Sequence, residues 1–146
     1  VNEDVAAYGL LNHPHVSEMR SALSQIGQTG IDLTFTPHLV PMTRGLLATC
    51  YARGTATGLQ CLQAARSYFA NREFVRVVET PPHTKWALGT NLVFLSYVAD
   101  PARGVILALA GIDNLGKGAA GQAIQNANLM TGQPAVTGLL SSPLWP

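Results

Sequence analysis

One stretch near the C-terminus constrains the fold more than any other. Residues Val105–Ile112 are almost wholly apolar, and the turn-prone pair Asp113-Asn114 follows them directly. Gly132 and Pro134 then form a typical helix stop. The stretch therefore predicts a buried strand, a polar turn and a helix. The helix itself is predicted by apolar side chains that recur at helical spacing, namely Ala120, Ala123, Ile124, Ala127 and Met130.

Three glycines crowd the first turns of that predicted helix, at Gly116, Gly118 and Gly121. Each glycine costs about 1 kcal/mol relative to alanine inside a helix, so three of them need a reason. One explanation is close packing of the helix on another element, and the other is close approach of the backbone to a ligand. The spacing alone favours packing and keeps the ligand as an alternative.

Two imidazoles, His13 and His15, flank Pro14 at the predicted start of another helix. Because the helix dipole disfavours a protonated imidazole at this end, a neutral imidazole here could act as a general base. A helix cap with an exposed histidine explains the same pattern and is the commoner arrangement. No metal site is predicted, because no third ligand stands nearby at a metal-like spacing. The helix is indicated by Val16, Met19, Leu23 and Ile26, with Gly27 and Gly30 ending it.

The segment after this helix predicts the first part of a sheet. Residues 31–36 alternate apolar and polar side chains, which is typical of a strand with one exposed face. Two prolines interrupt residues 37–41, so that segment is expected to be irregular. A strand is expected over residues 46–52, with Arg44 at its start. The planar guanidinium of Arg44 fits a carboxylate or phosphate, although a surface ion pair is the commoner role of such an arginine.

The remainder completes an α+β pattern. Thr57 and Gln60 match a capping box for a helix over residues 57–72, strands are expected over residues 74–78 and 92–98, and residues 100–104 are expected to form a hairpin turn. We predict one domain over residues 1–146, with a mixed, largely antiparallel sheet and helices packed on it. The buried face of the capped helix is expected at Leu62, Ala65, Tyr68 and Phe69, and Trp145 is a candidate anchor for the C-terminal tail.

Charge content indicates what surrounds the domain. The net charge is +1, from 9 basic and 8 acidic residues, so nothing indicates a nucleic-acid or membrane-surface partner. Charged residues make up only 12%, against a usual share of about 25%, so we expect another domain or subunit to cover much of the surface. No apolar run reaches the ~20 residues that span a bilayer, and no signal peptide is visible. Cys50 and Cys61 lie in apolar segments and are expected to be core residues of a protein in a reducing compartment.

Three sequence blocks together resemble one enzyme family. They are NHPHVSEM at residues 12–19, FTPHLVPMTRGLLAT at 35–49 and IDNLGKGAAGQAIQN at 112–126, and GTN at 89–91 is a shorter match. The chain resembles the C-terminal catalytic and dimerisation domain of the N-acetyl-gamma-glutamyl-phosphate reductases, the arginine-pathway branch of the semialdehyde dehydrogenase superfamily. The fold that this resemblance implies is that of the C-terminal domain of glyceraldehyde-3-phosphate dehydrogenase-like enzymes.

The resemblance implies a cytoplasmic oxidoreductase of arginine biosynthesis. The reaction would be the reversible NADPH-dependent reduction of N-acetyl-gamma-glutamyl phosphate to N-acetylglutamate 5-semialdehyde plus phosphate, through a cysteine thioester. Either His13 or His15 would be the catalytic acid/base, and the resemblance does not choose between them. The other implied site residues are His38 and Arg44 for the anionic groups of the substrate, and Asn114 and Gly118 for the nicotinamide end of NADP.

The chain also departs from the family pattern. The family's nucleotide-binding half and its nucleophilic cysteine lie upstream of Val1, so this chain alone is expected to be inactive and to need that upstream domain and further copies of itself in a homo-oligomer. Ser17 stands where the family usually has proline, and Gly116 where it often has valine. Neither Cys50 nor Cys61 lies in the family's Gly-Cys-Tyr-Pro context. Two alternatives stay open: a lysine-pathway relative acting on an aminoadipyl substrate, and a non-catalytic dimerisation module.

Overall fold

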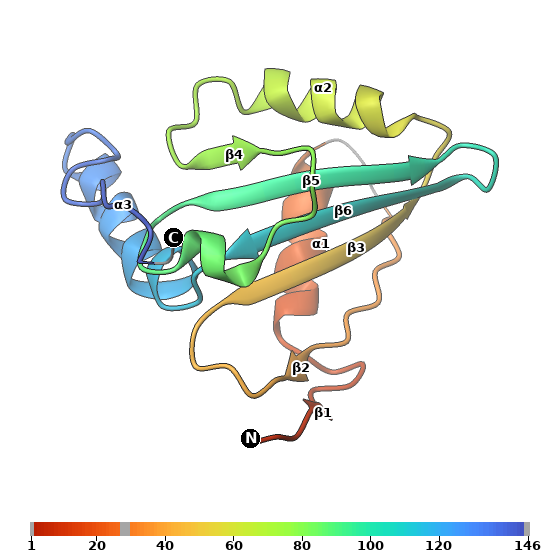
Figure 1. Cartoon of the computed structure of the whole chain (residues 1–146), viewed down its shortest axis with the longest axis horizontal. Coiled ribbons are helices and arrows are strands. Elements are labelled where there is room, and N and C mark those ends of the chain that lie inside the picture. The colour runs from red at the N-terminus through yellow and green to blue at the C-terminus, as the bar shows by residue number, and fades with distance from the viewer. Residues whose placement is uncertain (1, 27–29, 145–146) are drawn as a thin grey trace. The chain divides into compact units, whose positions relative to one another are not determined.

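A computed structural model describes residues 2–26 and 30–144 of the chain (Figure 1). The chain forms two compact units, Val1–Thr43 and Arg44–Pro146, and each is described by itself. The expected helix stop at Gly27 and the expected tail anchor at Trp145 lie outside the described residues. One domain over residues 1–146 stays a prediction.

The described residues of the first unit contain one helix, α1 (His15–Gln25), close to its predicted bounds. The stripe Val16, Met19 and Leu23 is half-buried, whereas Ile26 is 73% exposed. The strand predicted over residues 31–36 is wrong. Burial does alternate along it, with every second side chain half-buried, but the segment pairs with no strand among the described residues. The alternation of apolar and polar residues therefore reflects alternating half-buried and exposed side chains, and it does not indicate hydrogen bonding to another strand.

A two-stranded ribbon completes the first unit. β1 (Ala6–Ala7) pairs antiparallel with β2 (His38–Leu39). The irregular segment predicted over residues 37–41 is therefore wrong at its centre. The prolines flank β2, and Pro37 contributes only its carbonyl oxygen, which accepts a hydrogen bond from the Tyr8 N–H at 3.1 Å. A proline can take this position because the pairing does not need its missing N–H.

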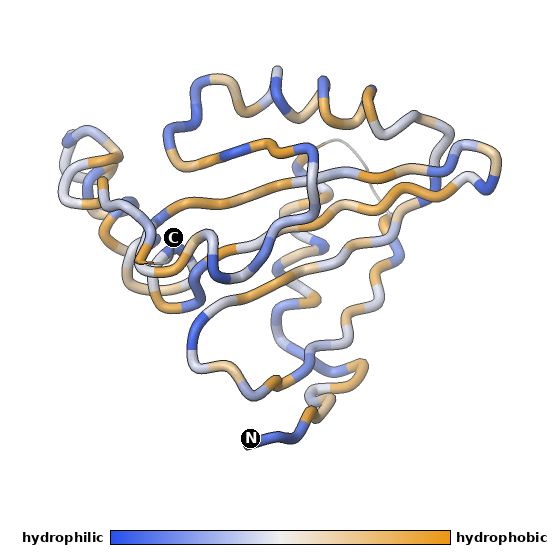
Figure 2. The backbone as a smooth tube through the Cα atoms, viewed as in Figure 1, coloured by the Kyte–Doolittle hydropathy of each residue, from blue (hydrophilic) through white to orange (hydrophobic). Residues whose placement is uncertain are grey.

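The second unit is built on a four-stranded sheet with the order β3-β6-β5-β4. β3 pairs antiparallel with β6, β6 pairs antiparallel with β5, and β4 runs parallel to β5. The mixed, largely antiparallel sheet is thus confirmed, as is the central place of the apolar strand β6, whose hydropathy can be followed in Figure 2. The strands are β3 (Leu46–Arg53), β4 (Val75–Val77), β5 (Val93–Asp100) and β6 (Val105–Ile112).

One face of this sheet packs against α2 (Gly58–Tyr68). The capping box of Thr57 and Gln60 is confirmed, and Leu62 and Ala65 are buried as predicted. The predicted burial of Tyr68 is wrong, since the helix ends there and the side chain is 69% exposed. Burial raises the pKa of Tyr97 on β5, and the thiols of Cys61 on α2 and Cys50 on β3 add to the shift.

The opposite face is partly covered by the 84–92 segment, which begins with the 3-10 helix η1 (Thr84–Ala87). The Trp86 ring lies 5.6 Å from the Phe94 ring of β5, edge to face. β3 is an edge strand, and most of its residues are exposed. The predicted core position of Cys50 is therefore wrong, because an edge strand has a neighbour on one side only.

The glycine-rich segment forms a π-helix, η2 (Gly116–Ala120), that continues into α3 (Gly121–Met130). A Cβ on Gly116 would lie 2.5 Å from the Thr90 carbonyl oxygen, and one on Gly121 would lie 2.4 Å from Asn91 Oδ1. Close packing is thus confirmed as the reason for these two glycines. Gly118 is different, because it is exposed and a Cβ there would meet nothing closer than 3.3 Å.

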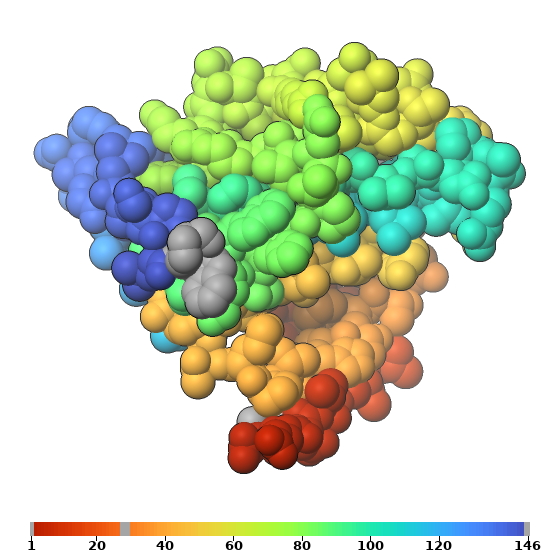
Figure 3. All heavy atoms as spheres, viewed as in Figure 1, coloured from red at the N-terminus to blue at the C-terminus, as the bar shows by residue number. Residues whose placement is uncertain are grey.

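The apolar stripe of α3 faces outward. Its polar face is turned inward instead, where Gln125 Oε1 accepts a hydrogen bond from Asn91 Nδ2 at 3.0 Å. The tail returns to the 84–92 segment, where the Leu144 N–H donates to the Leu88 carbonyl at 2.9 Å. In Figure 3 the blue C-terminal part of the chain lies beside the green surface. An exposed apolar stripe agrees with the expectation that another domain or subunit covers this surface. The exposed side chains of the stripe are Ala120, Ala123, Ile124, Ala127 and Met130.

Across residues 2–26 and 30–144, no helix combines the length and apolar character needed to cross a membrane. The same residues contain no group of three or more His, Cys, Asp or Glu side chains that could hold a metal ion.

Candidate functional site

The predicted site residues fall into two groups, one in each unit. Within each unit the structure shows which of them meet and what holds them. The first unit contains His13, His15 and His38, and the second contains Arg44, Asn114 and Gly118.

His13 is held in place by aromatic side chains. Its ring is half-buried, 5.5 Å from the Tyr8 ring and 5.2 Å from the Phe35 ring, both edge to face. Gly9 adopts a φ of +56°, and a Cβ there would lie 2.9 Å from the His13 ring. The backbone turn at Gly9 therefore leaves the space that the imidazole fills.

One hydrogen bond assigns the tautomer of the neutral His13 ring. The backbone N–H of His15 donates to His13 Nδ1 at 3.2 Å, so Nδ1 carries the lone pair and the neutral ring carries its proton on Nε2. His15 itself is exposed, and its Nε2 lies 4.0 Å from the Glu18 carboxylate. His13 Nδ1 thus accepts from the first backbone N–H of α1 while His15 is exposed, which agrees with the expected arrangement of a helix cap with an exposed histidine, although the N-cap position itself is taken by Pro14.

His38 lies on β2 with an exposed ring. Its Nδ1 lies 3.1 Å from the Thr36 carbonyl oxygen. Because a carbonyl can only accept, Nδ1 carries the proton in this contact, and the lone pair of the neutral ring is on Nε2. The proton positions of neutral His13 and His38 are thus opposite: His13 can donate from Nε2, whereas His38 can accept there.

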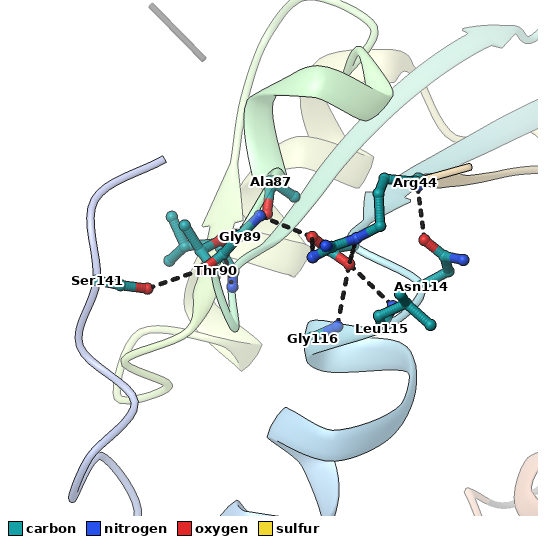
Figure 4. A network of polar contacts seen from close by, with 11 residues as sticks. Arg44, Ala87, Gly89, Thr90, Asn114, Leu115, Gly116 and Ser141 are labelled. Carbon is teal, nitrogen blue, oxygen red and sulfur yellow. Dashed lines mark hydrogen bonds and ion pairs between the residues drawn. The ribbon is translucent and has the colours of Figure 1, made fainter. Parts of the chain in front are cut away.

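The second group is organised by Asp113, whose side chain is fully buried. Oδ1 accepts from Arg44 Nε at 3.1 Å, and Oδ2 accepts from Arg44 Nη2. Three backbone N–H groups complete the carboxylate's contacts: Gly89 at 2.7 Å, Leu115 at 2.8 Å and Gly116 at 3.0 Å. We call these five residues the Asp113 cluster. Figure 4 shows its donors converging from three separate segments.

The charge of Asp113 is stabilised by these donors. Burial by itself opposes the charged form, but the hydrogen bonds from Arg44 and the three backbone N–H groups outweigh it and hold the pKa of Asp113 well below its usual range. The same pairing raises the pKa of Arg44. The two side chains therefore form an ion pair over the whole neutral pH range.

The side chain of Asn114 is held by Gly45, the residue that follows Arg44 in the sequence. Its Oδ1 accepts from the Gly45 N–H at 2.7 Å, and Figure 4 shows its side-chain nitrogen pointing away from this contact. Gly118 donates its N–H to the Asp113 carbonyl at 2.9 Å. Arg44, Asn114 and Gly118 are thus brought together around Asp113, which orders a turn that could receive a polar ligand.

Asp113 is the residue that sequence reasoning treated only as part of a turn. The available signal was its position directly after the apolar run of β6, since a carboxylate at the end of a buried strand needs a charged or N–H partner. Arg44 does form the expected ion pair, although with this buried partner and not at the surface.

Comparison with known proteins finds a matching family model and several curated relatives. A family model described as "Semialdehyde dehydrogenase, dimerisation domain" matches residues 1–114. Curated relatives include proteins named N-acetyl-gamma-glutamyl-phosphate reductase from Bradyrhizobium sp. (strain ORS 278), 60% identical over 99% of this chain, and from Methylobacterium sp. (strain 4-46), 56% identical over 99%. A third, of the same name, comes from Alkalilimnicola ehrlichii and is 47% identical over 95%. The chain spans 45%, 45% and 41% of the length of these relatives.

Proposed function

The chain belongs to the semialdehyde dehydrogenase dimerisation-domain family, and from this premise we propose that it is the C-terminal half of an N-acetyl-gamma-glutamyl-phosphate reductase. The observation that carries the proposal is the 60% identity over 99% of the chain to a protein of that name. The upstream half would supply the nucleotide-binding domain and the nucleophilic cysteine. The substrate would be N-acetyl-gamma-glutamyl phosphate, and the product would be the 5-semialdehyde.

The turn at Asn114 fits the nicotinamide end of NADP. Asn114 Oδ1 is occupied by the Gly45 N–H, so Nδ2 is the group available to a ligand, and a nicotinamide carboxamide offers the matching carbonyl acceptor. Gly118 adds an exposed backbone that a ligand can approach closely. When bound, the cofactor supplies hydride chemistry, and these residues would orient it. NADP is proposed over NAD on the family resemblance alone.

His13 or His15 would transfer a proton to or from the substrate. His13 presents a proton on Nε2 from a fixed ring, so it would donate to an oxygen or sulfur on which negative charge develops. His15 is a second candidate for this role. His38 and Arg44 are proposed to contact the anionic groups of the substrate, Arg44 with guanidinium hydrogens that Asp113 does not take.

The proposed reaction is tested by phosphate-dependent reduction of NADP with N-acetylglutamate 5-semialdehyde. The assay compares this chain with the longest natural protein that contains it. Activity in the longer protein only is the expected result. Activity in neither would point to the aminoadipyl substrate or to a non-catalytic module, and activity in this chain alone would contradict an upstream nucleophile.

A cytoplasmic location is part of the proposal. Both cysteines, Cys50 and Cys61, are free thiols, which is typical of proteins in a reducing compartment.

We further propose that the sheet of the second unit mediates assembly of two copies. Tyr51, Leu107 and Val98 form one row across β3, β6 and β5, because Leu107 is paired with both other residues. Tyr51 is 75% exposed and Val98 is 49% exposed. An exposed apolar row on a sheet is typical of a protein interface, and the family description names a dimerisation domain.

The expected effect of Tyr51→Glu is a dimer at least about 30-fold weaker, since a buried interface tyrosine is often worth ~2 kcal/mol. Light scattering during size-exclusion chromatography of the full-length protein would measure this. Tyr68→Glu is the matched control, because Tyr68 is 69% exposed but lies at the end of α2. Equal dimer stability in the two variants would rule out this face.

A further inference from the structure

Asp113 and Asn114 are consecutive in sequence but hold different partners. The Asp113 carboxylate takes two hydrogen bonds from Arg44 and three from backbone N–H groups, and it has no exposed surface. The Asn114 carboxamide takes one hydrogen bond, from the N–H of Gly45, the residue directly after Arg44. Both side chains are therefore anchored to the same short segment at the start of β3.

This arrangement decides which way the Asn114 carboxamide faces. A rotation of 180° about its last bond exchanges the oxygen and the nitrogen, and hence acceptor and donor. In the flipped state Nδ2 would face the Gly45 N–H, so two donors would oppose each other. The Gly45 N–H thus selects one orientation of the Asn114 carboxamide. It can do so only while the direction of the Gly45 N–H bond is itself fixed.

Two sets of hydrogen bonds to Asp113 fix the Gly45 N–H relative to Asn114. Along the chain, Asp113 Oδ1 binds the N–H groups of Leu115 and Gly116, so the turn on both sides of Asn114 is closed. Across the fold, the same carboxylate holds the Arg44 guanidinium, and Gly45 follows with a φ of +111° that few other residues adopt. In the view of Figure 4, Arg44 reaches the carboxylate from above, and Leu115 and Gly116 reach it from below.

We propose that Asp113 is a positioning residue for cofactor binding, because it holds Asn114 with Oδ1 on Gly45 and Nδ2 directed outward to a ligand carbonyl. The proposal rests on the proposed function, in which Asn114 lies against the nicotinamide carboxamide. Asp113 itself has no free surface, so it acts through Asn114 and does not contact the cofactor.

The test is a double-mutant cycle in the longest natural protein that contains this chain. NADPH binding is titrated by its fluorescence for Asn114→Ala, Asp113→Asn and the double variant. Asn114→Ala is expected to raise the Kd about five- to tenfold, the loss of one neutral hydrogen bond. Asp113→Asn is expected to raise the Kd by no more than Asn114→Ala does. The double variant is expected to match Asn114→Ala within about twofold, since residues that act through one another are not additive.

The outcomes separate the inference from the proposed function. A wild-type Kd in Asp113→Asn, or losses that add in the double variant, overturns the inference alone. An unchanged Kd in Asn114→Ala overturns the placement of Asn114 and the inference with it. Absence of reductase activity in the wild-type protein overturns the proposed function, while the NADPH titration still decides the inference.

A second variant covers the case in which Asp113→Asn does not fold. Arg44→Lys keeps the positive charge and one hydrogen bond to Asp113 but loses the planar fork. It is expected to raise the Kd for NADPH about two- to threefold, and to have no such effect when Asn114 is already alanine. A wild-type Kd in Arg44→Lys, or the same rise in both backgrounds, counts against the inference.

Discussion

His13→Asn is expected to lower turnover of the full-length protein about 100-fold or more, the usual value of a positioned acid/base. The ring is half-buried between Tyr8 and Phe35, and the His15 backbone N–H fixes its lone pair on Nδ1. Asparagine can still accept at the Nδ1 position but cannot release and regain a proton. The kcat for NADP reduction at saturating semialdehyde and phosphate measures the loss.

The matched control for this variant is His15→Asn. His15 begins α1 only two residues later, but its ring is exposed, with the Glu18 carboxylate 4.0 Å from Nε2 and the His13 ring 4.6 Å away, edge to face. We expect its kcat to stay within a few-fold of wild type. A large loss in His15→Asn with near-normal turnover in His13→Asn would reverse the assignment, and small losses in both would remove the acid/base role from this pair.

The sequence predicted those helices and strands that are determined by residues close together in the chain. The capping box at Thr57 and Gln60 starts α2 because both of its hydrogen bonds lie within four residues. The apolar run at residues 105–112 predicted the central strand, since only a strand buried on both faces tolerates it. Residues 31–36 failed as a strand because pairing needs a partner, and alternation alone does not supply one.

The candidate site shows the same limit more sharply. Arg44 and Asn114 could be selected by residue type and by family resemblance, but their relation to each other could not. It depends on the register that sets Leu46 opposite Ile112, and thereby brings residues 44 and 113 together. The sequence marked Asp113 only as a turn former, because its five donors come from three segments that the fold alone makes neighbours.

Asp113→Asn is expected to cost about 3–5 kcal/mol of stability at pH 7, the range for breaking a buried ion pair by removing one partner. An asparagine oxygen can replace one carboxylate oxygen, but its NH2 group would then face the donors of Gly89 or Arg44. Urea unfolding of the full-length protein at pH 7 measures the loss. Asp100→Asn is the control, because Asp100 accepts one hydrogen bond, from the Arg103 N–H at 3.2 Å, in a hairpin turn. Asparagine also suits such a turn, so we expect a loss below about 1 kcal/mol.

The stability difference between wild type and Asp113→Asn is also expected to depend on pH. The pKa of Asp113 is lowered in the folded protein, so its stabilising contribution is complete above the unfolded value of about 4 and is lost as pH falls below it. The difference in unfolding free energy between wild type and Asp113→Asn should therefore be constant from pH 7 to pH 5 and shrink by pH 3. A gap that stays the same at pH 3, or a loss at pH 7 no larger than that of Asp100→Asn, would mean that the carboxylate does not hold the Asp113 cluster together by its charge.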